Sequence, residues 1–214
     1  MVRIFPLIFI LLWSSAFITT KPIIDNSDPF SALAFRFFFV AIGFYLFSIY
    51  SKHSIIVKRK NLIESVLSGV LFHGLYLGGV FYSISIGMPT GIAALIVTLQ
   101  PVLTNALSGP ILGEKVSKKQ WLGVFLGFVG AALVLGLDVG SEIPLIGLFA
   151  TIVALIAITS STIWQKKLSN NLPLSVSNFY QAVGGCFFHV MIIILFAEPY
   201  IDFTKTFIVA MSHQ

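Results

Sequence analysis

Charged residues are scarce in this chain. Asp, Glu, Lys and Arg together make up 10% of its 214 residues, whereas apolar residues make up 57%, and the mean hydropathy is +0.98. A soluble domain of this size would have too few polar residues to cover its surface. The apolar surface therefore requires lipid around it, and the sequence predicts an all-α membrane protein that crosses the bilayer several times.

Cysteine pairs, metal-ligand motifs and catalytic motifs are also missing. The one cysteine, Cys186, has no partner for a disulfide, and the four histidines fall in separate segments. There is no HExxH, no GxSxG and no phosphate-binding glycine loop, and the acidic residues lie almost entirely between apolar segments. These absences predict that the protein is not an enzyme and holds no metal and no cofactor.

Seven apolar segments are long enough to cross a bilayer, which requires roughly 20 apolar residues per helix. They lie at about 4–24, 30–50, 62–87, 89–112, 119–137, 145–168 and 174–197. A further apolar run, 206–214, would cover only about 14 Å as a helix. It is either a surface-lying tail or part of an eighth span, and we favour the second interpretation.

The basic residues gather on one side of these segments, if the segments alternate across the bilayer. Ten of the thirteen are Arg3, Lys52, Lys58, Arg59, Lys60, Lys115, Lys118, Lys119, Lys166 and Lys167. Basic loops stay in the cytoplasm, so we expect a multi-pass protein of the cell (inner) membrane with a cytoplasmic N-terminus. The same rule accounts for the net charge of +5 without nucleic acid as a partner.

A loose internal repeat divides the chain into two parts. Ser14-Ser15-Ala16-Phe17 and Pro29-Phe30-Ser31 recur as Ser160-Ser161-Thr162-Ile163 and Pro173-Leu174-Ser175, at an offset of about 145 residues. The offset spans five helices, an odd number, so the second copy would be inverted relative to the first, as in secondary transporters. The sequence thus predicts a complete five-helix repeat at 1–137 and an incomplete second repeat at 145–214.

Two residues of the first repeat are candidates for a substrate cavity. Arg36 is the only charged residue well inside a span, and a charge at that depth usually faces a cavity or a partner. Arg36 is also close enough to Pro29 to reach the outer interface by snorkelling. Trp13, near mid-span beside two serines, suits a cavity wall or plain packing against lipid.

Polar groups on later spans extend the candidate list. His73 and Tyr76 share one helical face with Gly79 and Val80, which suits either a polar pathway or hydrogen bonding between helices. Gln100 and Pro101 interrupt the fourth span, as a kink or as the helix break of a transport site. Gln181 takes roughly the place of Arg36 in the second copy. The pairs Gly74–Gly78 and Gly123–Gly127 are GxxxG motifs, typical of close helix packing.

Five features together resemble the drug/metabolite transporter superfamily, EamA type. They are Trp13-Ser14-Ser15-Ala16-Phe17 with Lys21, the in-span Arg36, Thr90-Gly91 with Ala93-Ala94-Leu95-Ile96, Leu99-Gln100-Pro101-Val102, and Leu112-Gly113-Glu114-Lys115-Val116 leading to Gln120-Trp121-Leu122-Gly123 and Gly127-Phe128-Val129-Gly130. The stretch from about 88 to 135 is the most specific part. Members of that family usually have ten spans in two five-helix halves, and here the last three are absent or incomplete.

The resemblance implies a transporter that exports or exchanges small metabolites, often amino acids or toxic analogues, frequently with the proton gradient. It also implies a central cavity shared between halves. Glu114, at the cytoplasmic end of the fourth span, would be a structural or gating residue, and its charge also suits pairing with a neighbouring lysine.

Three interpretations of the short second repeat remain open. The chain is a fragment of an ordinary transporter, or it completes its cavity with a second copy or another subunit, or it is a non-transporting membrane binding or assembly protein. Transport of a small organic solute across the lipid bilayer is the leading hypothesis.

Overall fold

The computed structural model describes residues 5–113, 117–135, 143–168, 172–196 and 198–214, and its regular elements are helices. In chain order they are α1 (Phe5–Ile24), α2 (Pro29–Tyr50), α3 (Arg59–Gly69), the π-helix η1 (Val70–Tyr76), α4 (Leu77–Ser85), α5 (Thr90–Val97), α6 (Gln100–Leu112), α7 (Lys118–Leu135), α8 (Leu145–Leu168), α9 (Leu174–Phe196) and α10 (Lys205–His213). The predicted all-α class is confirmed.

Five stretches of described helix are long and apolar enough to cross a membrane. They are Pro29–Tyr50, Arg59–Ser85, Thr90–Gly109, Leu145–Lys166 and Leu174–Phe196. A shorter apolar helix, Ile10–Ile24, lies before them. The multi-span character is therefore established by length and composition, whereas the count of seven full spans stays a prediction.

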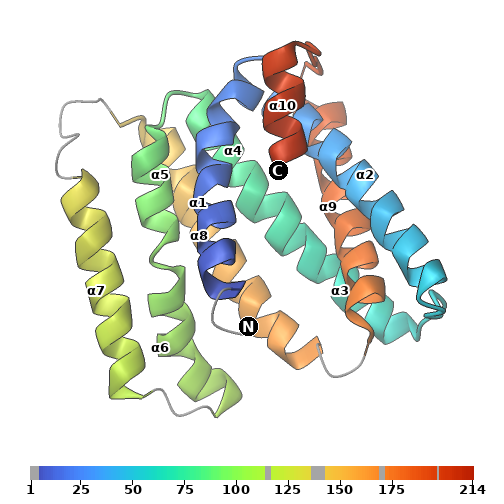
Figure 1. Ribbon diagram of the computed structural model, residues 1–214, viewed down its shortest axis with the longest axis horizontal. Coiled ribbons are helices and arrows are strands. Elements are labelled where there is room, and N and C mark those ends of the chain that lie inside the picture. The colour runs from blue at the N-terminus through green and yellow to red at the C-terminus, as the bar shows by residue number, and fades with distance from the viewer. Residues whose placement is uncertain (1–4, 114–116, 136–142, 169–171, 197) are drawn as a thin grey trace.

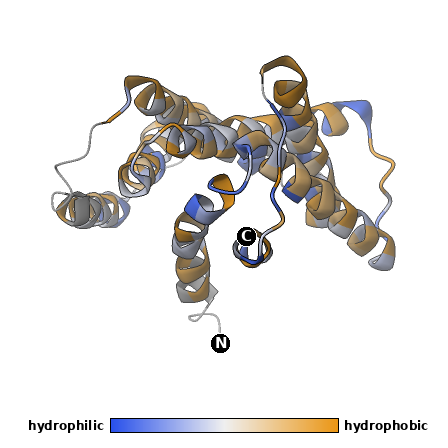
Figure 2. Cartoon of the chain, turned by 90° about the horizontal axis from the view of Figure 1, so that it is seen from above, coloured by the Kyte–Doolittle hydropathy of each residue, from blue (hydrophilic) through white to orange (hydrophobic). Residues whose placement is uncertain are grey.

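The helices run alternately up and down in one bundle (Figure 1). The centre is the long contact between α2 and α9, and α8 packs against α4 and η1. Figure 2 shows α1 and the end of α10 together on one side of a row formed by the other helices. α7 lies at the edge of the bundle, against α5 and α6. This arrangement leaves α1, α2, η1 and α10 around one interior space.

Two of the expected single spans contain breaks. The third expected span is a continuous helix with seven π-helical residues, Val70–Tyr76, in its middle, a feature that is frequent at functional sites. The fourth divides at Thr98 and Leu99, so that α5 ends before Gln100-Pro101 begins α6. Proline fits the first turn of a helix, because the N–H that it lacks would be unpaired there.

Glycines set the close crossing of α9 over α3 and η1. A side chain at Gly69 would collide with the main chain of Gln181, and one at Gly184 with the main chain of Val66. The close packing expected at Gly74 and Gly78 is present, against Phe188 and His189 of α9.

The same expectation for Gly123 and Gly127 is wrong within the described residues. No described atom outside their own helix lies within 4 Å of a Cβ placed at either glycine. The physical reason is position, because α7 is an edge helix and this face of it has no partner helix among the described elements.

Candidate functional site

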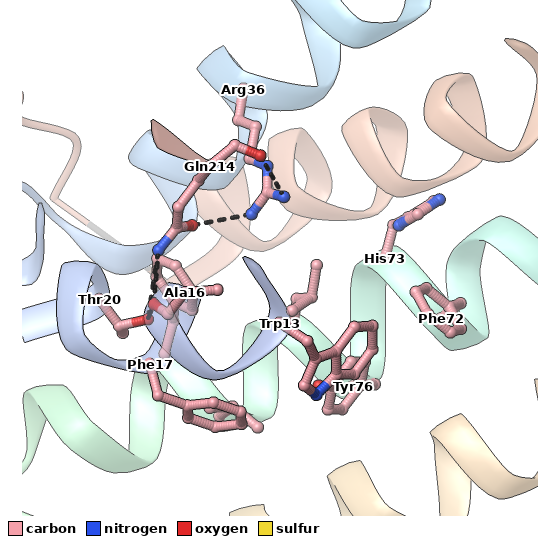
Figure 3. A pocket seen from close by; sticks show the side chains of 12 residues that line it. Trp13, Ala16, Phe17, Thr20, Arg36, Phe72, His73, Tyr76 and Gln214 are labelled. Atoms are coloured by element: carbon pink, nitrogen blue, oxygen red, sulfur yellow. Dashed lines mark hydrogen bonds between the residues drawn. The ribbon is translucent and has the colours of Figure 1, made fainter. Parts of the chain in front are cut away.

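A cavity of about 130 Å³ lies inside the bundle between α1, α2, the η1–α4 segment and the C-terminal end of α10 (Figure 3). Aromatic and aliphatic side chains form most of its wall, with a few polar groups among them. The lining residues are Trp13, Ala16, Phe17, Thr20, Arg36, Phe72, His73, Tyr76, Leu77, Val80, Phe81 and Gln214. A mostly apolar cavity with a few polar groups is typical of small-molecule sites.

Arg36 holds the charged position in this cavity. The Asp28 carboxylate accepts a hydrogen bond from Ser31 N and caps the start of α2, and Arg36 follows two turns later. Its guanidinium Cζ lies 5.5 Å from the Phe37 ring centroid, within cation–π range. Arg36 therefore faces the interior of the bundle.

The guanidinium is already paired with Gln214. Arg36 Nη1 donates to Gln214 Oε1 at 2.8 Å, and Nη2 donates to the main-chain oxygen of Gln214 at 2.9 Å (Figure 3). Its Nε is buried without a hydrogen-bond partner in the described part of the chain. Two parallel donors of this kind also fit a carboxylate or amide well.

Gln214 also ties α10 to α1. Its Nε2 donates to the main-chain oxygen of Ala16 at 3.0 Å, to Thr19 Oγ1 at 3.0 Å and to Thr20 Oγ1 at 3.3 Å. One residue earlier, His213 Nε2 lies 3.2 Å from Ser15 Oγ. A single side chain thus connects three helices at one end of the cavity.

The structure brings Trp13, His73 and Tyr76 into the same wall as Arg36. The Trp13 and Tyr76 rings point into the cavity from α1 and η1 (Figure 3). The His73 ring packs against Phe37 in a tilted arrangement, with centroids 4.4 Å apart, and its Nδ1 is buried without a described partner. Of the two residues expected on the same face, Val80 is among the lining residues, and Gly79 packs instead against Ala150 and Ala154 of α8.

His189 supports His73 from the neighbouring helix. His189 Nε2 donates to the main-chain oxygen of His73 at 2.9 Å, and its ring stacks on Phe37 with centroids 6.0 Å apart. A side chain at Gly185 on α9 would collide with the Cβ of His73, so the two helices are in close contact at this point. Sequence spacing gave no sign of this pair, because 116 residues separate the two histidines.

The two glutamines of the candidate list lie elsewhere. Gln100 Nε2 donates to Thr104 Oγ1 and Thr162 Oγ1 and joins α6 to α8. Gln181 accepts from Gln165 Nε2 at 3.0 Å and donates to Ser177 Oγ at 3.0 Å. Neither residue is in the lining of the Arg36 cavity.

The last two residues of the candidate list are Pro101 and Glu114, which were predicted to kink or gate the fourth span. Pro101 stands in the first turn of α6, next to the helix break, and outside the cavity lining. Glu114 lies outside the described residues.

Several cavity residues had no signal in the sequence. Thr20, Phe72 and Phe81 are ordinary span residues, and Gln214 belongs to a run that is too short to place by hydropathy. Only packing of α10 against α1 and α2 brings Gln214 to Arg36. Among the described residues, no group of three His, Cys, Asp or Glu side chains could hold a metal ion.

The bundle and its cavity define a multi-span α-helical membrane protein with one cationic group facing an aromatic interior. More narrowly, the chain belongs to the EamA-like transporter family, whose model matches residues 3–136.

Curated relatives agree with this membership. The uncharacterized transporter YvbV of Bacillus subtilis is 23% identical over 217 residues, which cover 95% of this chain and 70% of that protein. A probable amino-acid metabolite efflux pump of Salmonella typhimurium is 25% identical, over 78% of this chain and 54% of the pump. The uncharacterized transporter YyaM of Bacillus subtilis is 27% identical, over 83% and 60%. The chain thus spans between about half and 70% of the length of these relatives.

A solved crystal structure, described only as that of a protein, has the same fold. It superposes with a TM-score of 0.77 over 95% of this chain and 70% of the other, at 19% sequence identity.

Proposed function

We propose that this chain transports small organic solutes that carry a carboxylate or a similar acceptor group, with Arg36 as the anchoring residue. The observation that carries the proposal is the pairing of both Arg36 Nη atoms with acceptor oxygens of Gln214 inside the cavity. A solute carboxylate would take over both hydrogen bonds. Proteins of similar sequence include two named as probable amino-acid metabolite efflux pumps, which supports the choice of solute class.

The rest of the cavity favours an apolar or aromatic body on that solute. Trp13, Phe17, Phe72, Tyr76 and Phe81 line the space beside Arg36. No Asp or Glu side chain is among the lining residues, so the cavity offers an ammonium group only neutral acceptors, namely hydroxyl and carbonyl oxygens and the His73 ring nitrogen. The carboxylate, rather than the amine, is therefore the group that the site selects.

Coupling to protons, where it occurs, would fall to His73. Its ring and the Arg36 guanidinium both lie against Phe37. Like charges so close repel, so an anion that neutralises Arg36 would favour a proton on His73. The other titratable groups around His73 are Tyr76 on η1 and His189 on α9. On this mechanism, carboxylate binding strengthens as the pH falls.

The two-repeat organisation, 1–137 and 145–214, is part of the proposal, and matched contacts support it. Ser15 of α1 meets His213 of α10, and Ser161 of α8 meets Ser68 of α3 at 3.1 Å. The two serines are 146 positions apart and their partners 145. Equivalent residues thus make equivalent contacts in two places, as an inverted repeat requires.

A second subunit is a further part of the proposal. A groove of about 410 Å³ between α2 and α10 is lined by Arg36 and Gln214 and by apolar residues such as Phe35, Phe39 and Phe207. It leads from Arg36 to the outside of the bundle. We infer that a second copy or another subunit covers it. A strictly monomeric mass in mild detergent would count against the second copy.

Binding by Arg36 can be tested on the purified chain in nanodiscs. The probes are 3-phenylpropionate and its neutral amide. Wild type should bind the acid more tightly than the amide, and Arg36→Gln should lose about tenfold to a hundredfold in affinity for the acid only, because a charged hydrogen bond contributes about 1.5–3 kcal/mol. Arg36→Lys should retain part of the preference, and Lys119→Gln on α7 is the matched control.

The same preparation tests the role of His73 and the transport activity. Acid binding should rise as the pH falls, and His73→Gln should remove that rise. In proteoliposomes, counterflow of the acid should be lost in Arg36→Gln. Equal binding of acid and amide by wild type and Arg36→Gln would reject the proposed solute class.

A further inference from the structure

A basic groove lies at the end of the bundle where α2 passes to α3, away from the cavity. It has a volume of about 680 Å³, and the residues that form it come from the α2–α3 loop and from Leu172 and Pro173 before α9. Three lysines line it, Lys52, Lys58 and Lys60. No acidic residue is among the described lining residues, and Glu64 forms a long ion pair with Lys60 at 3.9 Å. The groove therefore carries a strong positive charge.

The loop that forms this groove is held in place. Tyr180 Oη on α9 donates to the main-chain oxygen of Ile55 at 2.7 Å, and His53 Nδ1 lies 3.0 Å from Ser175 Oγ. Lys52 follows the C-cap of α2 with a φ of 56°, a left-handed conformation that non-glycine residues seldom adopt. Both contacts fix the loop to α9, so the lysines are presented on an ordered surface.

An apolar groove runs along the same two helices. It has a volume of about 460 Å³ between α2 and α9, and Ile42 and Tyr45 form one wall while Phe179, Val183 and Phe187 form the other. Val183 and Phe187 are exposed, at 37% and 61%, on a face that would meet lipid. This groove would accept an extended hydrocarbon chain.

The distance between the basic groove and the apolar groove matches the distance between the headgroup and the acyl chains of a phospholipid. Tyr45 on α2 and Lys52 just beyond its end are seven residues apart, about 10 Å at the rise of a helix. Phe179 on α9 and Pro173 just before its start are six residues apart. The headgroup layer of a leaflet is about 5–8 Å thick. Tyr50, 85% exposed at this end of α2, suits the aromatic belt at the membrane interface.

We infer that this corner of the bundle binds an anionic phospholipid, with the phosphate-bearing headgroup among Lys52, Lys58 and Lys60 and one acyl chain in the groove between α2 and α9. Basic clusters next to a membrane helix attract anionic headgroups by about 1 kcal/mol per cation. The apolar groove adds what a free phosphate lacks, a site for the chain. This site is separate from the Arg36 cavity and does not depend on the proposed transport function.

The inference can be tested by native mass spectrometry of the purified chain titrated with phosphatidylglycerol or phosphatidylcholine. Wild type should retain phosphatidylglycerol at least tenfold more strongly. The double variant Lys52→Gln/Lys58→Gln should bind the two lipids alike. The matched control, Lys118→Gln/Lys119→Gln on α7, removes the same charge and should keep the preference.

Two further arms identify the occupant. Val183→Trp, at an exposed position, fills the apolar groove and should weaken retention of both lipids. Glycerol 3-phosphate, which has the headgroup phosphate but no acyl chain, should not displace phosphatidylglycerol. Equal retention of the two lipids by wild type, loss of preference in the α7 control, unchanged retention in Val183→Trp, or displacement by glycerol 3-phosphate would each overturn the inference.

Discussion

At the scale of single residues, the pairing of Arg36 with Gln214 decides what the cavity can do. A buried guanidinium requires acceptors, because an unpaired buried charge is costly. Two oxygens of Gln214 accept hydrogen bonds from Arg36, and its amide nitrogen donates a hydrogen bond to α1. On the proposed function, a solute carboxylate that takes both Nη hydrogen bonds of Arg36 would displace Gln214, whose amide nitrogen also holds α10 to α1. Binding of the solute would then be coupled to release of this contact between α10 and α1.

This competition predicts opposite effects for two substitutions at Gln214. Gln214→Ala removes the competing side chain and should raise the affinity for 3-phenylpropionate about fivefold, the equivalent of about one hydrogen bond of 1 kcal/mol. Gln214→Glu places a carboxylate beside Arg36 and should lower the affinity below that of wild type. Equilibrium binding to the nanodisc preparation measures both. The same affinity in all three proteins would show that Gln214 does not compete.

Part of this site could be predicted from its residues, and part could not. Arg36 could be selected from the sequence because a charge inside a membrane span is costly and usually functional. Trp13, His73 and Tyr76 could be selected as polar or amphipathic side chains in the middle of apolar segments. Gln214 and His189 have no such mark. Their roles follow from the contacts of α10 with α1 and of α9 with η1, and contacts between distant segments cannot be read from local patterns.

At the scale of helices, glycine determines how closely α9 approaches α3. The main chains of α9 and α3 are in contact at Gly69 and Gly184. This close approach brings His189 within hydrogen-bond distance of the main-chain oxygen of His73. A GxxxG pattern alone did not separate the packed glycines from the exposed ones on α7, because the pattern has no information on which helix is the neighbour.

Gly184→Ala should therefore destabilise the bundle, by about 1–3 kcal/mol, the usual cost of overpacking. The added methyl group meets the main chain of Val66, which cannot rotate away. Gly127→Ala on α7 is the matched control and should cost nothing, since no described atom outside its helix lies within 4 Å of the new methyl group and alanine favours helix. Thermal unfolding in mild detergent, followed by circular dichroism, compares them; similar midpoints would contradict this account of the crossing.

At the scale of the whole molecule, the helix ends that carry most of the basic residues lie where the charge pattern of the sequence predicts them, at one end of the bundle. The α2–α3 loop, the start of α7 and the end of α8 lie at the same end of the bundle (Figure 1). Lys52, Lys58, Lys118 and Lys166 therefore fall at the same end of the bundle, although they come from four helix ends. Hydropathy and charge could predict this arrangement because the bilayer imposes it on each segment separately.

Cysteine labelling in whole cells tests the orientation that follows from this charge distribution. With Cys186→Ser as background, Ser54→Cys in the α2–α3 loop and Asp202→Cys before α10 lie at opposite ends of the bundle and are both exposed. A membrane-impermeant maleimide should label Asp202→Cys in intact cells, because basic loops remain in the cytoplasm. Ser54→Cys should react only after the membrane is permeabilised. The reverse pattern would place the N-terminus outside the cell. It would also place the basic groove at the outer leaflet, so the anionic phospholipid proposed to bind there would have to come from that leaflet.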